Sequence, residues 1–358
     1  MARPLLYWAV AACATCIAPR ALFAQDPAAT PATGVRPHLA VILPLRSQSI
    51  GKLAEWVRRG IAAAAQVERG LPLLLYSTGD DTEQTLSAYQ QALSSGARAV
   101  IGPFGRREVS ALAASGLVDV PTLSLTTPEG ERILPRMQYV FGLQLDAEAR
   151  QVARLAQRNG YQRAFIVGSD AGPQKRAALA FAEEWRRLRG EVAGVFVLGA
   201  EVSALGKLRE TLQNAAPDMV FLALDAPHAR QVRGYLGTGA MIYATSQVFA
   251  NLDDKLANFD LNGVRFLDMP WLLQPDHPAV LAYPRPEPRA TLEQERFYAL
   301  GVDAYRLIQS LLRSAQSIEE PLDGITGTLS AGADHVFQRE LVPALFADGQ
   351  AQALTAAP

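Results

Sequence analysis

Histidine is the residue type best suited to metal binding and proton transfer, and its four copies in this sequence are widely spaced. They are His38, His228, His277 and His335. Zinc sites commonly use pairs of ligands only a few residues apart, and no two of these histidines have such a spacing. We therefore interpret each histidine as a surface or strand-edge residue, and the sequence predicts no metal site.

Serine and aspartate motifs that could support hydrolysis are incomplete. In Gly168-Ser-Asp-Ala-Gly172, Ser169 is not at the central position that a nucleophile elbow requires. In the pair Asp80-Asp81, Asp81 fits the N-cap of a helix, and Asp80 is expected to be a solvated residue. Asp268 and Asp303 lie in apolar segments, where a structural hydrogen bond or ion pair is favoured over catalysis. The sequence therefore predicts no catalytic residue, no cofactor and no enzyme activity.

The elements that must position any site follow a repeated strand-then-helix order. Continuous apolar runs such as Leu39–Leu43 and Met219–Leu224 are typical of strands buried in a parallel sheet. Amphipathic segments such as Gly51–Arg69 and Gln174–Arg189 alternate with them. This alternation predicts parallel sheets covered by helices on both faces. Two such series, joined near Tyr139–Leu143, predict two lobes with a cleft between them.

The last part of the chain departs from this order. Thr291–Ser314 carries apolar residues around most of its circumference, which predicts a deeply buried helix. Gly332–Pro343 is expected to form a short antiparallel addition. The strand-then-helix order of the remaining chain predicts an α/β protein.

The composition is that of a globular protein. Of 358 residues, 49% are hydrophobic and 19% are charged, which allows a sizeable core. The formal net charge is −1, and the basic residues are spread along the chain. The sequence therefore has neither the basic footprint of a nucleic-acid-binding protein nor a polybasic patch for a membrane.

Residues 1–24 are expected to be an export signal. The segment has a positive charge near its start, an apolar stretch over Leu5–Ala18 and a cleavage site at Ala21–Ala24. Residues 25–36 contain small residues and two prolines and are expected to be a flexible linker. The predicted location of the mature protein is the periplasm.

The sequence has two cysteines, Cys13 and Cys16, and both lie in the predicted signal. Val-Ala-Ala-Cys13 fits a loose lipoprotein box, and lipidation at Cys13 would anchor the chain to a membrane, with the outer membrane as the candidate. Cleavage after Ala24 would instead leave a mature chain without disulfides or thiolate sites. Both outcomes remain open, and both predict export.

Six segments in a fixed order resemble a known family. They are Ala40-Val-Ile-Leu-Pro-Leu45, Ala88-Tyr-Gln-Gln-Ala92 with Val100-Ile-Gly-Pro103, Tyr243–Phe249, Arg265–Leu273, Tyr298–Arg306 and Leu322–Leu329. The chain resembles the LppC/LpoA family of envelope proteins, whose members activate penicillin-binding proteins, from His38 to Gly349. The resemblance implies a two-lobed fold like that of type I periplasmic binding proteins, in which each lobe is a mainly parallel sheet covered by helices.

The resemblance also implies that each lobe is built from separated stretches of the chain. Lobe one would comprise 37–142 plus 291–317, lobe two 143–290 plus 318–349, and 350–358 would be a tail. Full-length activators of the family carry an N-terminal helical-repeat domain as well. Because only 25–36 separates the predicted signal from the first strand, this chain is expected to correspond to the C-terminal domain alone.

Amino-acid-binding relatives of this fold hold their ligand in the cleft, with hydroxyl groups of lobe one and an acidic residue of lobe two. The corresponding cleft candidates are Arg106, Ser124, Thr126, Thr127, Thr245, Ser246 and Gln247. The last three include no carboxylate, so a bound ammonium group would be desolvated without a partner. Arg106 favours an anionic ligand. Amino-acid binding is therefore disfavoured, although a small-molecule ligand in the cleft stays open.

The function implied by the resemblance is non-enzymatic regulation of peptidoglycan synthesis through contact with a class A penicillin-binding protein. Candidates for that contact are Asp268, Met269 and Trp271, which flank the strand-ending Pro270, although a tryptophan is more often buried in its own lobe. The alternative is a periplasmic solute-binding receptor of an ABC transporter, with an anionic or amino-acid-type ligand in the cleft. Neither reading involves nucleic acid, or a membrane beyond a lipid anchor.

Overall fold

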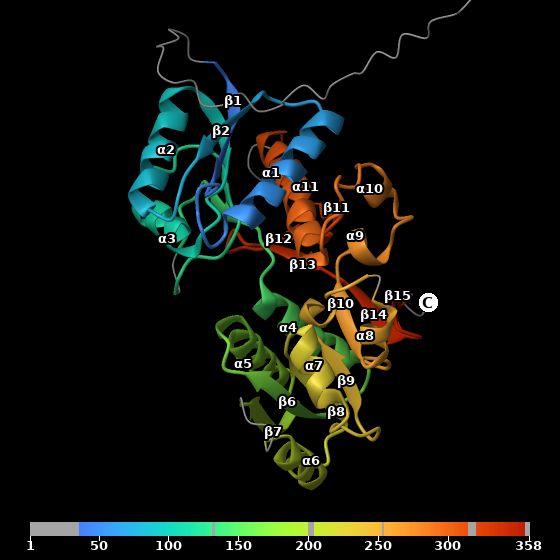
Figure 1. Ribbon diagram of the computed structural model, residues 1–358. Coiled ribbons are helices and arrows are strands. Elements are labelled where there is room, and N and C mark those ends of the chain that lie inside the picture. The colour runs from blue at the N-terminus through green and yellow to red at the C-terminus, as the bar shows by residue number, and fades with distance from the viewer. Residues whose placement is uncertain (1–35, 131–132, 200–203, 253, 314–319, 355–358) are drawn as a thin grey trace, which may run out of the picture.

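The computed structural model describes residues 36–130, 133–199, 204–252, 254–313 and 320–354. The predicted export signal, Cys13 and nearly all of the predicted linker lie outside these ranges. The described residues form two α/β lobes, one above the other in Figure 1. The α/β architecture with two lobes that the sequence predicts is therefore confirmed.

The first lobe is built on a fully parallel sheet. Within the described ranges its strand order is β2-β1-β3-β4-β5. The strands are β1 (His38–Leu43), β2 (Leu73–Ser77), β3 (Ala97–Ile101), β4 (Thr122–Ser124) and β5 (Gln138–Val140). Strand β1 is an interior strand of the sheet, between β2 and β3, and is buried along its whole length, as its continuous apolar run predicts. Helices α1 (Gly51–Val67), α2 (Thr82–Ser94) and α3 (Arg106–Ala114) connect these strands.

The second lobe contains a mixed sheet in the order β15-β14-β10-β9-β8-β6-β7. Its parallel strands are β6 (Arg163–Ser169), β7 (Glu191–Leu198), β8 (Met219–Ala223), β9 (Met241–Ala244) and β10 (Arg265–Asp268). Helices α4 (Leu145–Arg158) and α5 (Gly172–Arg187) pack into one core, and α6 (Ala204–Ala215) and α7 (Ala226–Arg233) into another. Alternate residues of β6 enter the two cores, so the sheet is covered on both faces.

Two antiparallel strands complete this sheet, β14 (Val342–Ala347) and β15 (Gln350–Ala353). They are joined by Asp348-Gly349, and both of these residues have positive φ, as a tight hairpin turn requires. The segment predicted as a tail, 350–358, thus contains an ordered strand. The reason is local, because Asp-Gly is a strong hairpin signal.

A small antiparallel sheet of β11 (Leu322–Gly324), β12 (Gly327–Ala331) and β13 (Phe337–Glu340) lies at the junction of the lobes. An isolated bridge between Val140 and Val336 connects it to the end of β5, and His335 stacks on Tyr139. The stretch 318–349, expected in lobe two, is therefore divided. Only β14 joins the seven-stranded sheet, whereas β11–β13 form a sheet of their own against the first lobe.

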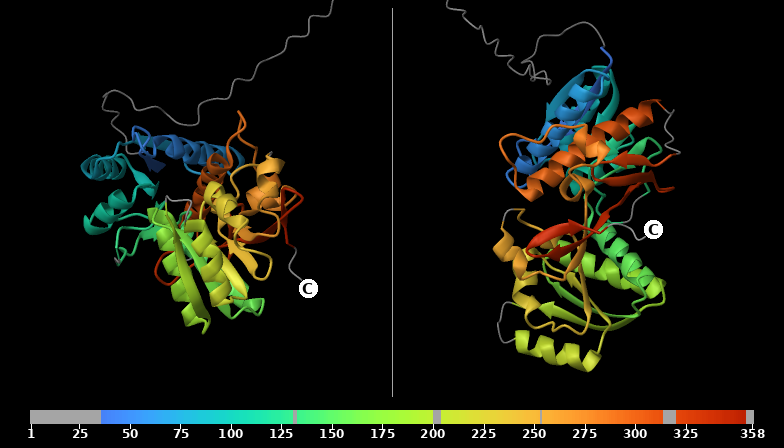
Figure 2. Two further views of the ribbon diagram at one scale, coloured as in Figure 1. Left: turned by 60° about the horizontal axis from the view of Figure 1, so that its bottom comes forward. Right: turned by 90° about the vertical axis from the view of Figure 1, so that its right-hand side faces the viewer.

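Helix α11 (Leu292–Arg313) is buried on most of its circumference, as its sequence predicts. It packs along α1, and both views of Figure 2 show the two helices side by side. Gly60 of α1 and Gly301 of α11 permit this close approach, because a Cβ at either position would overlap the backbone of the other helix. The short helices η1 (Ser246–Val248), α8 (Lys255–Phe259), α9 (Pro270–Leu273) and α10 (Pro278–Leu281) complete the fold. In the part of the chain described, no helix has the length and apolar content needed to cross a membrane.

The contact between α1 and α11 predicts a cost for any side chain at Gly301. A Cβ there would meet the carbonyl oxygen of Val57, so Gly301→Ala should lower the free energy of unfolding by about 1–3 kcal/mol through overpacking. The matched control is Gly206→Ala in α6, where a Cβ meets nothing within 4 Å. That change should be neutral or stabilise by up to about 1 kcal/mol. Urea denaturation measures both, and equal values would contradict the close packing.

Candidate functional site

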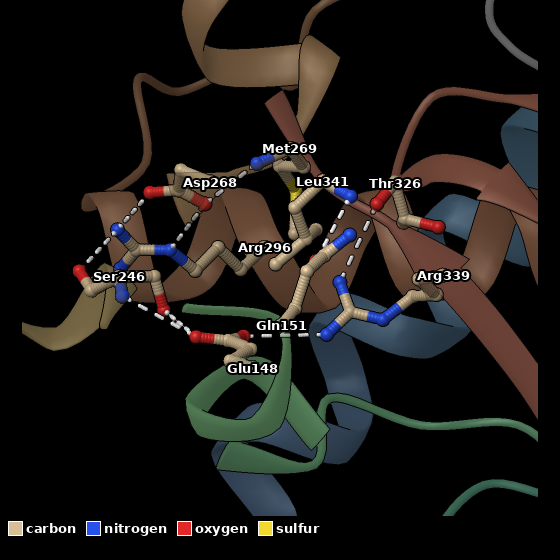
Figure 3. A network of polar contacts seen from close by, with 9 residues as sticks. All are labelled: Glu148, Gln151, Ser246, Asp268, Met269, Arg296, Thr326, Arg339 and Leu341. Carbon is tan, nitrogen blue, oxygen red and sulfur yellow. Dashed lines mark hydrogen bonds and ion pairs between the residues drawn. The ribbon is translucent and has the colours of Figure 1, made fainter. Parts of the chain in front are cut away.

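The junction between the lobes holds a network of buried charged side chains (Figure 3). Its members come from α4, from the ends of β9 and β10, from α11 and from the sheet of β12 and β13. Buried charges are tolerated only when they are paired and hydrogen-bonded.

Asp268 and Arg296 form a buried ion pair. Asp268 is the last residue of β10 and Arg296 lies in the first turns of α11, and both are buried. Arg296 contacts both carboxylate oxygens, with Nη2 at 2.6 Å from Oδ2 and Nε at 3.3 Å from Oδ1. Its Nη2 also donates to the carbonyl oxygens of Ser246 and Phe249. Burial acts to lower the pKa of Arg296, but the charge of Asp268 raises it above its ordinary value.

Glu148, near the start of α4, forms the second buried contact. One carboxylate oxygen accepts hydrogen bonds from Oγ of Ser246 at 2.8 Å and from its backbone N–H at 3.3 Å. The other oxygen lies 3.3 Å from Nη2 of Arg339. Burial raises the pKa of Glu148 above its ordinary value, and Arg339 opposes that change.

Asp303, in the middle of α11, holds the turn between β11 and β12. It accepts hydrogen bonds from the backbone N–H groups of Ile325 and Thr326 and from the hydroxyl group of Thr326. Arg306 lies one turn further along and pairs with Asp303 at 3.1 Å and with Glu68 at 3.3 Å. The structural interpretation of Asp303 is confirmed, since its carboxylate is occupied by packing contacts.

Three of the cleft candidates of the first lobe, Arg106, Ser124 and Thr127, make hydrogen bonds within that lobe. Arg106 starts α3 and donates to the hydroxyl group of Thr127 at 3.2 Å and to the carbonyl oxygen of Pro128 at 2.9 Å. Ser124 is buried at the end of β4 and accepts a hydrogen bond from Nε2 of Gln138. Thr126 and Thr127 are half-buried. The two bonds of Arg106 stabilise the loop after β4 and direct its guanidinium group to that loop.

The candidates of the second lobe are placed differently. Thr245 and Ser246 are buried after β9, and Ser246 is committed to Glu148. Gln247 is exposed. The sequence indicated no carboxylate near this strand end, but the structure supplies Glu148 from α4, 98 residues away in the chain. No local signal could have identified it.

A pocket of about 440 Å³ lies at the carboxyl ends of β8, β9 and β10, under the start of α11. Open α/β sheets commonly bind ligands at this edge. The charged residues that line it are Glu148, Asp225, Glu293 and Arg296. Ser246 and Gln247 also line it. Among the described residues that form its wall, the other cleft candidates are absent, namely Arg106, Ser124, Thr126, Thr127 and Thr245. The preference for an anion expected from Arg106 is therefore not a property of this pocket, whose charged lining residues are mainly acidic.

The residues proposed as a partner interface are all buried. Asp268, Met269 and Trp271 have almost no exposed surface. Pro270 begins α9 and the short helix turns the indole inward, where Trp271 donates to Glu295 and packs against Tyr298. Because none of the three is accessible, they cannot form the contact surface that was expected of them. The lipidation candidate Cys13 lies outside the described residues.

Comparison with known proteins identifies relatives for most of the chain. Residues 33–349 match a family model described as "LppC putative lipoprotein". The chain is 24% identical over 313 residues to the penicillin-binding protein activator LpoA of Haemophilus ducreyi, covering 85% of this chain and 52% of that protein. It is 24% identical over 347 residues to LpoA of Photobacterium profundum, covering 86% and 56%. The chain thus spans about half the length of the curated relatives it matches.

Solved structures show the same fold. The C-domain of LpoA from Haemophilus influenzae, described as a regulator of PBP1A, matches with a TM-score of 0.75 at 21% identity, over 89% of this chain and all of that chain. A protein from Chromobacterium violaceum, described as a "putative branched-chain amino acid ABC transporter", matches with a TM-score of 0.74 at 37% identity, over 87% of this chain and all of that chain. The expected fold class, that of periplasmic binding proteins, is confirmed.

The first prediction from the junction concerns the buried ion pair. Arg296→Met would leave Asp268 charged, buried and unpaired, and should lower the free energy of unfolding by about 3–5 kcal/mol. Replacing both partners, as Asp268→Leu with Arg296→Met, should recover part of that loss. The control is Arg163→Met, which breaks an exposed pair with Glu191 and should cost about 1 kcal/mol or less. Similar losses for Arg296→Met and Arg163→Met would show that the buried pair does not hold the junction.

The second prediction concerns pH. The pKa of Glu148 is raised above its ordinary value of 4.5 by burial, so its contribution to stability is fully present below pH 4.5 and is lost as pH rises through the folded-state pKa. Glu148→Gln cannot ionise and should show a smaller loss of stability above pH 4.5 than the parent does.

Glu184 contributes to stability with the opposite dependence on pH. Hydrogen bonds from Arg187 and Arg154 lower its pKa to about 2, so its contribution is present above pH 4.5 and is lost as pH falls toward 2. Glu184→Gln should therefore lose stability at neutral pH and show a smaller loss in acid. Denaturation at a series of pH values measures both variants. Identical pH profiles for the parent and Glu148→Gln would contradict the burial of that carboxylate.

Proposed function

This chain belongs to the LppC family, and from that premise we propose that it is a non-enzymatic envelope protein that binds and activates a class A penicillin-binding protein. The observation that carries the proposal is the match of residues 33–349 to the family, with relatives named as penicillin-binding protein activators. Because the chain spans about half of those relatives, the proposal assigns the synthase contact to the two-lobed domain. The proposed location is the periplasm, with lipidation at Cys13 as the means of anchoring.

The junction network supports a binding platform of fixed shape. Arg296 and Asp303 both lie on α11, and they connect this helix to β10 and to the turn between β11 and β12. Moving the lobes apart would expose or separate these charges, and breaking one buried pair costs about 3–5 kcal/mol. A preorganised surface loses little conformational entropy when a protein binds to it.

A non-enzymatic role agrees with the use of the buried carboxylates. Glu148, Asp268 and Asp303 are each occupied by an arginine together with backbone or hydroxyl donors. Within the described residues, no group of three or more histidine, cysteine, aspartate or glutamate side chains is arranged to hold a metal ion. The named relatives are activators, and a catalytic role for this chain has no support from them.

A second candidate function is that of a solute receptor for a transporter. The pocket of about 440 Å³ and the 37% identity to the Chromobacterium violaceum protein favour it. Asp268 pairs with Arg296 and Arg339 pairs with Glu148, so the remaining charges of the pocket, Asp225 and Glu293, favour a ligand with an ammonium group. This reverses the anionic ligand that the sequence suggested.

One experiment separates the two functions. The mature chain should bind a purified class A synthase with a Kd of about 1 μM or lower and raise its rate of glycan polymerisation or cross-linking. Glu293→Ala, which changes an exposed residue of the pocket, should leave that activation unchanged.

A solute receptor would give the opposite result. An amine or amino acid at about 100 times its Kd would then stabilise the parent by about 2.7 kcal/mol, and Glu293→Ala would weaken that effect. Stabilisation of this kind without any binding to the synthase would overturn the proposed function. A monofunctional synthase of a different class serves as the control for binding specificity.

A further inference from the structure

Strand β7 forms an open edge of the second sheet. It is the last strand in the order, and within the described part of the chain no other strand pairs with its outer side. Edge strands are usually protected by charged residues, by proline or by being short. Strand β7 has eight residues, and the segment Val192–Leu198 contains neither a charged residue nor a proline.

One face of this strand exposes apolar side chains. Phe196 and Leu198 pack into the core that α6 covers. Because side chains alternate along a strand, Val195 and Val197 point to the opposite face, the one on which α5 lies. Their exposed fractions are 55% and 50%, which is high for valine in the sheet of a folded domain.

Helix α5 extends this surface. Lys175, Leu179, Ala182 and Arg186 are spaced by four, three and four residues and so lie on one face of the helix. All of them except Ala182 are exposed. The opposite side of α5 packs on α4 through Ala177, Ala180 and Glu184. Since α4 covers β9 and β10 while α5 contacts β6, β7 and β8, the Lys175–Arg186 face is the one beside β7.

The centre of this surface is apolar and its rim is basic. Leu179 is 56% exposed and lies between Lys175 and Arg186 along the helix face. Arg176, Arg186 and Arg189 are exposed, and none of them has an ion-pair partner among the residues that the structure describes. Lys175 has an exposed contact of 3.7 Å with Asp170, which an acidic partner would have to compete with. The other nearby acids, Glu183, Glu184 and Glu191, are paired with Arg150, with Arg154 and Arg187, and with Arg163. An apolar centre with a charged rim is the usual anatomy of a protein interface.

We propose that the outer edge of β7, together with Leu179, Val195 and Val197, is the docking site for an extended acidic segment of a partner protein. The segment adds a strand to β7 through backbone hydrogen bonds, and its apolar side chains cover the two valines and Leu179. Its acidic side chains pair with Lys175 and Arg186. This inference rests on the proposed function, because it takes the class A synthase as the partner.

The charges favour an acidic partner over a second copy of this chain. Antiparallel pairing of β7 with the β7 of another copy would bring the Lys175 end of one α5 toward the Arg186 end of the other. Like charges brought together in this way oppose association. The site also lies at the end of lobe two that is remote from lobe one (Figure 1), so a partner can reach it without disturbing the junction.

The test measures the affinity of the full mature chain for the synthase with three sets of substitutions. Val195→Thr with Val197→Thr keeps the β-branched shape and removes apolar surface, and Val195→Asp with Val197→Asp adds negative charge. Lys175→Glu with Arg186→Glu reverses the rim. The Asp and Glu pairs should each weaken binding by about tenfold or more, and the Thr pair by less. Reversal of the rim should also reduce the salt dependence of Kd.

The matched control is Leu256→Asp on α8, which changes an apolar side chain that is 86% exposed on a different part of lobe two and should leave Kd unchanged. Hydrogen exchange provides a measurement that needs no variant. Backbone amides of 191–198 should exchange more slowly in the complex than in the free protein, because the added strand protects them.

Each result has a distinct meaning. A parent chain that binds no class A synthase overturns the proposed function and this inference with it. A parent that binds, with unchanged affinity in the Asp and Glu variants and unchanged exchange in 191–198, overturns the inference alone. If the protein by itself forms a dimer that Val195→Asp with Val197→Asp dissociates, the edge belongs to a second copy and the inference is also overturned.

Discussion

The contact between Arg296 and Asp268 is the interaction on which the junction of the lobes depends. Both side chains are buried, and a buried charge without its partner costs several kcal/mol. The same guanidinium also satisfies the carbonyl oxygens of Ser246 and Phe249, which follow β9. One residue of α11 therefore joins the ends of two strands of lobe two to the helix that packs along α1. A typical domain has a net stability of only about 5–15 kcal/mol, so leaving either of these two charges without its partner would remove a large fraction of it.

The other contacts of α11 extend the same constraint. Asp303 holds the turn between β11 and β12, and Arg306 reaches Glu68 just after the end of α1. Glu148 and Arg339 connect α4 to the small sheet. Because each carboxylate requires its own cation, the relative position of the two lobes is set by several charges at once. The helix can carry them only because Gly60 and Gly301 let it approach α1 closely.

This arrangement explains why charged residues gather at the pocket while exposed apolar residues lie elsewhere. The pocket lies against the network and its charged lining residues are mainly acidic, whereas Arg106 stabilises the loop after β4 and Ser124 bonds to Gln138 of β5. Trp271 is drawn inward by its hydrogen bond to Glu295, so the segment that was expected to contact a partner is part of the core. Accessible apolar surface is found instead at Val195 and Val197, at the edge of the sheet.

The sequence alone determined the α/β class, the two series of strands and helices, and the burial of elements such as β1 and α11. These properties depend on local periodicity, because a strand or helix shows which face it buries in the spacing of its own apolar residues. Capping is equally local, and Asp81 does accept a hydrogen bond from the N–H of Glu83 at the start of α2. Only the tertiary structure decided which charges meet. Glu148 and Ser246 are 98 residues apart, and their contact depends on how the chain crosses between the lobes, which no local pattern records. The tertiary structure also decided that the side chain of Trp271 points inward. A buried and an exposed tryptophan can have identical neighbours in sequence and differ only in the residues that the fold places beside them.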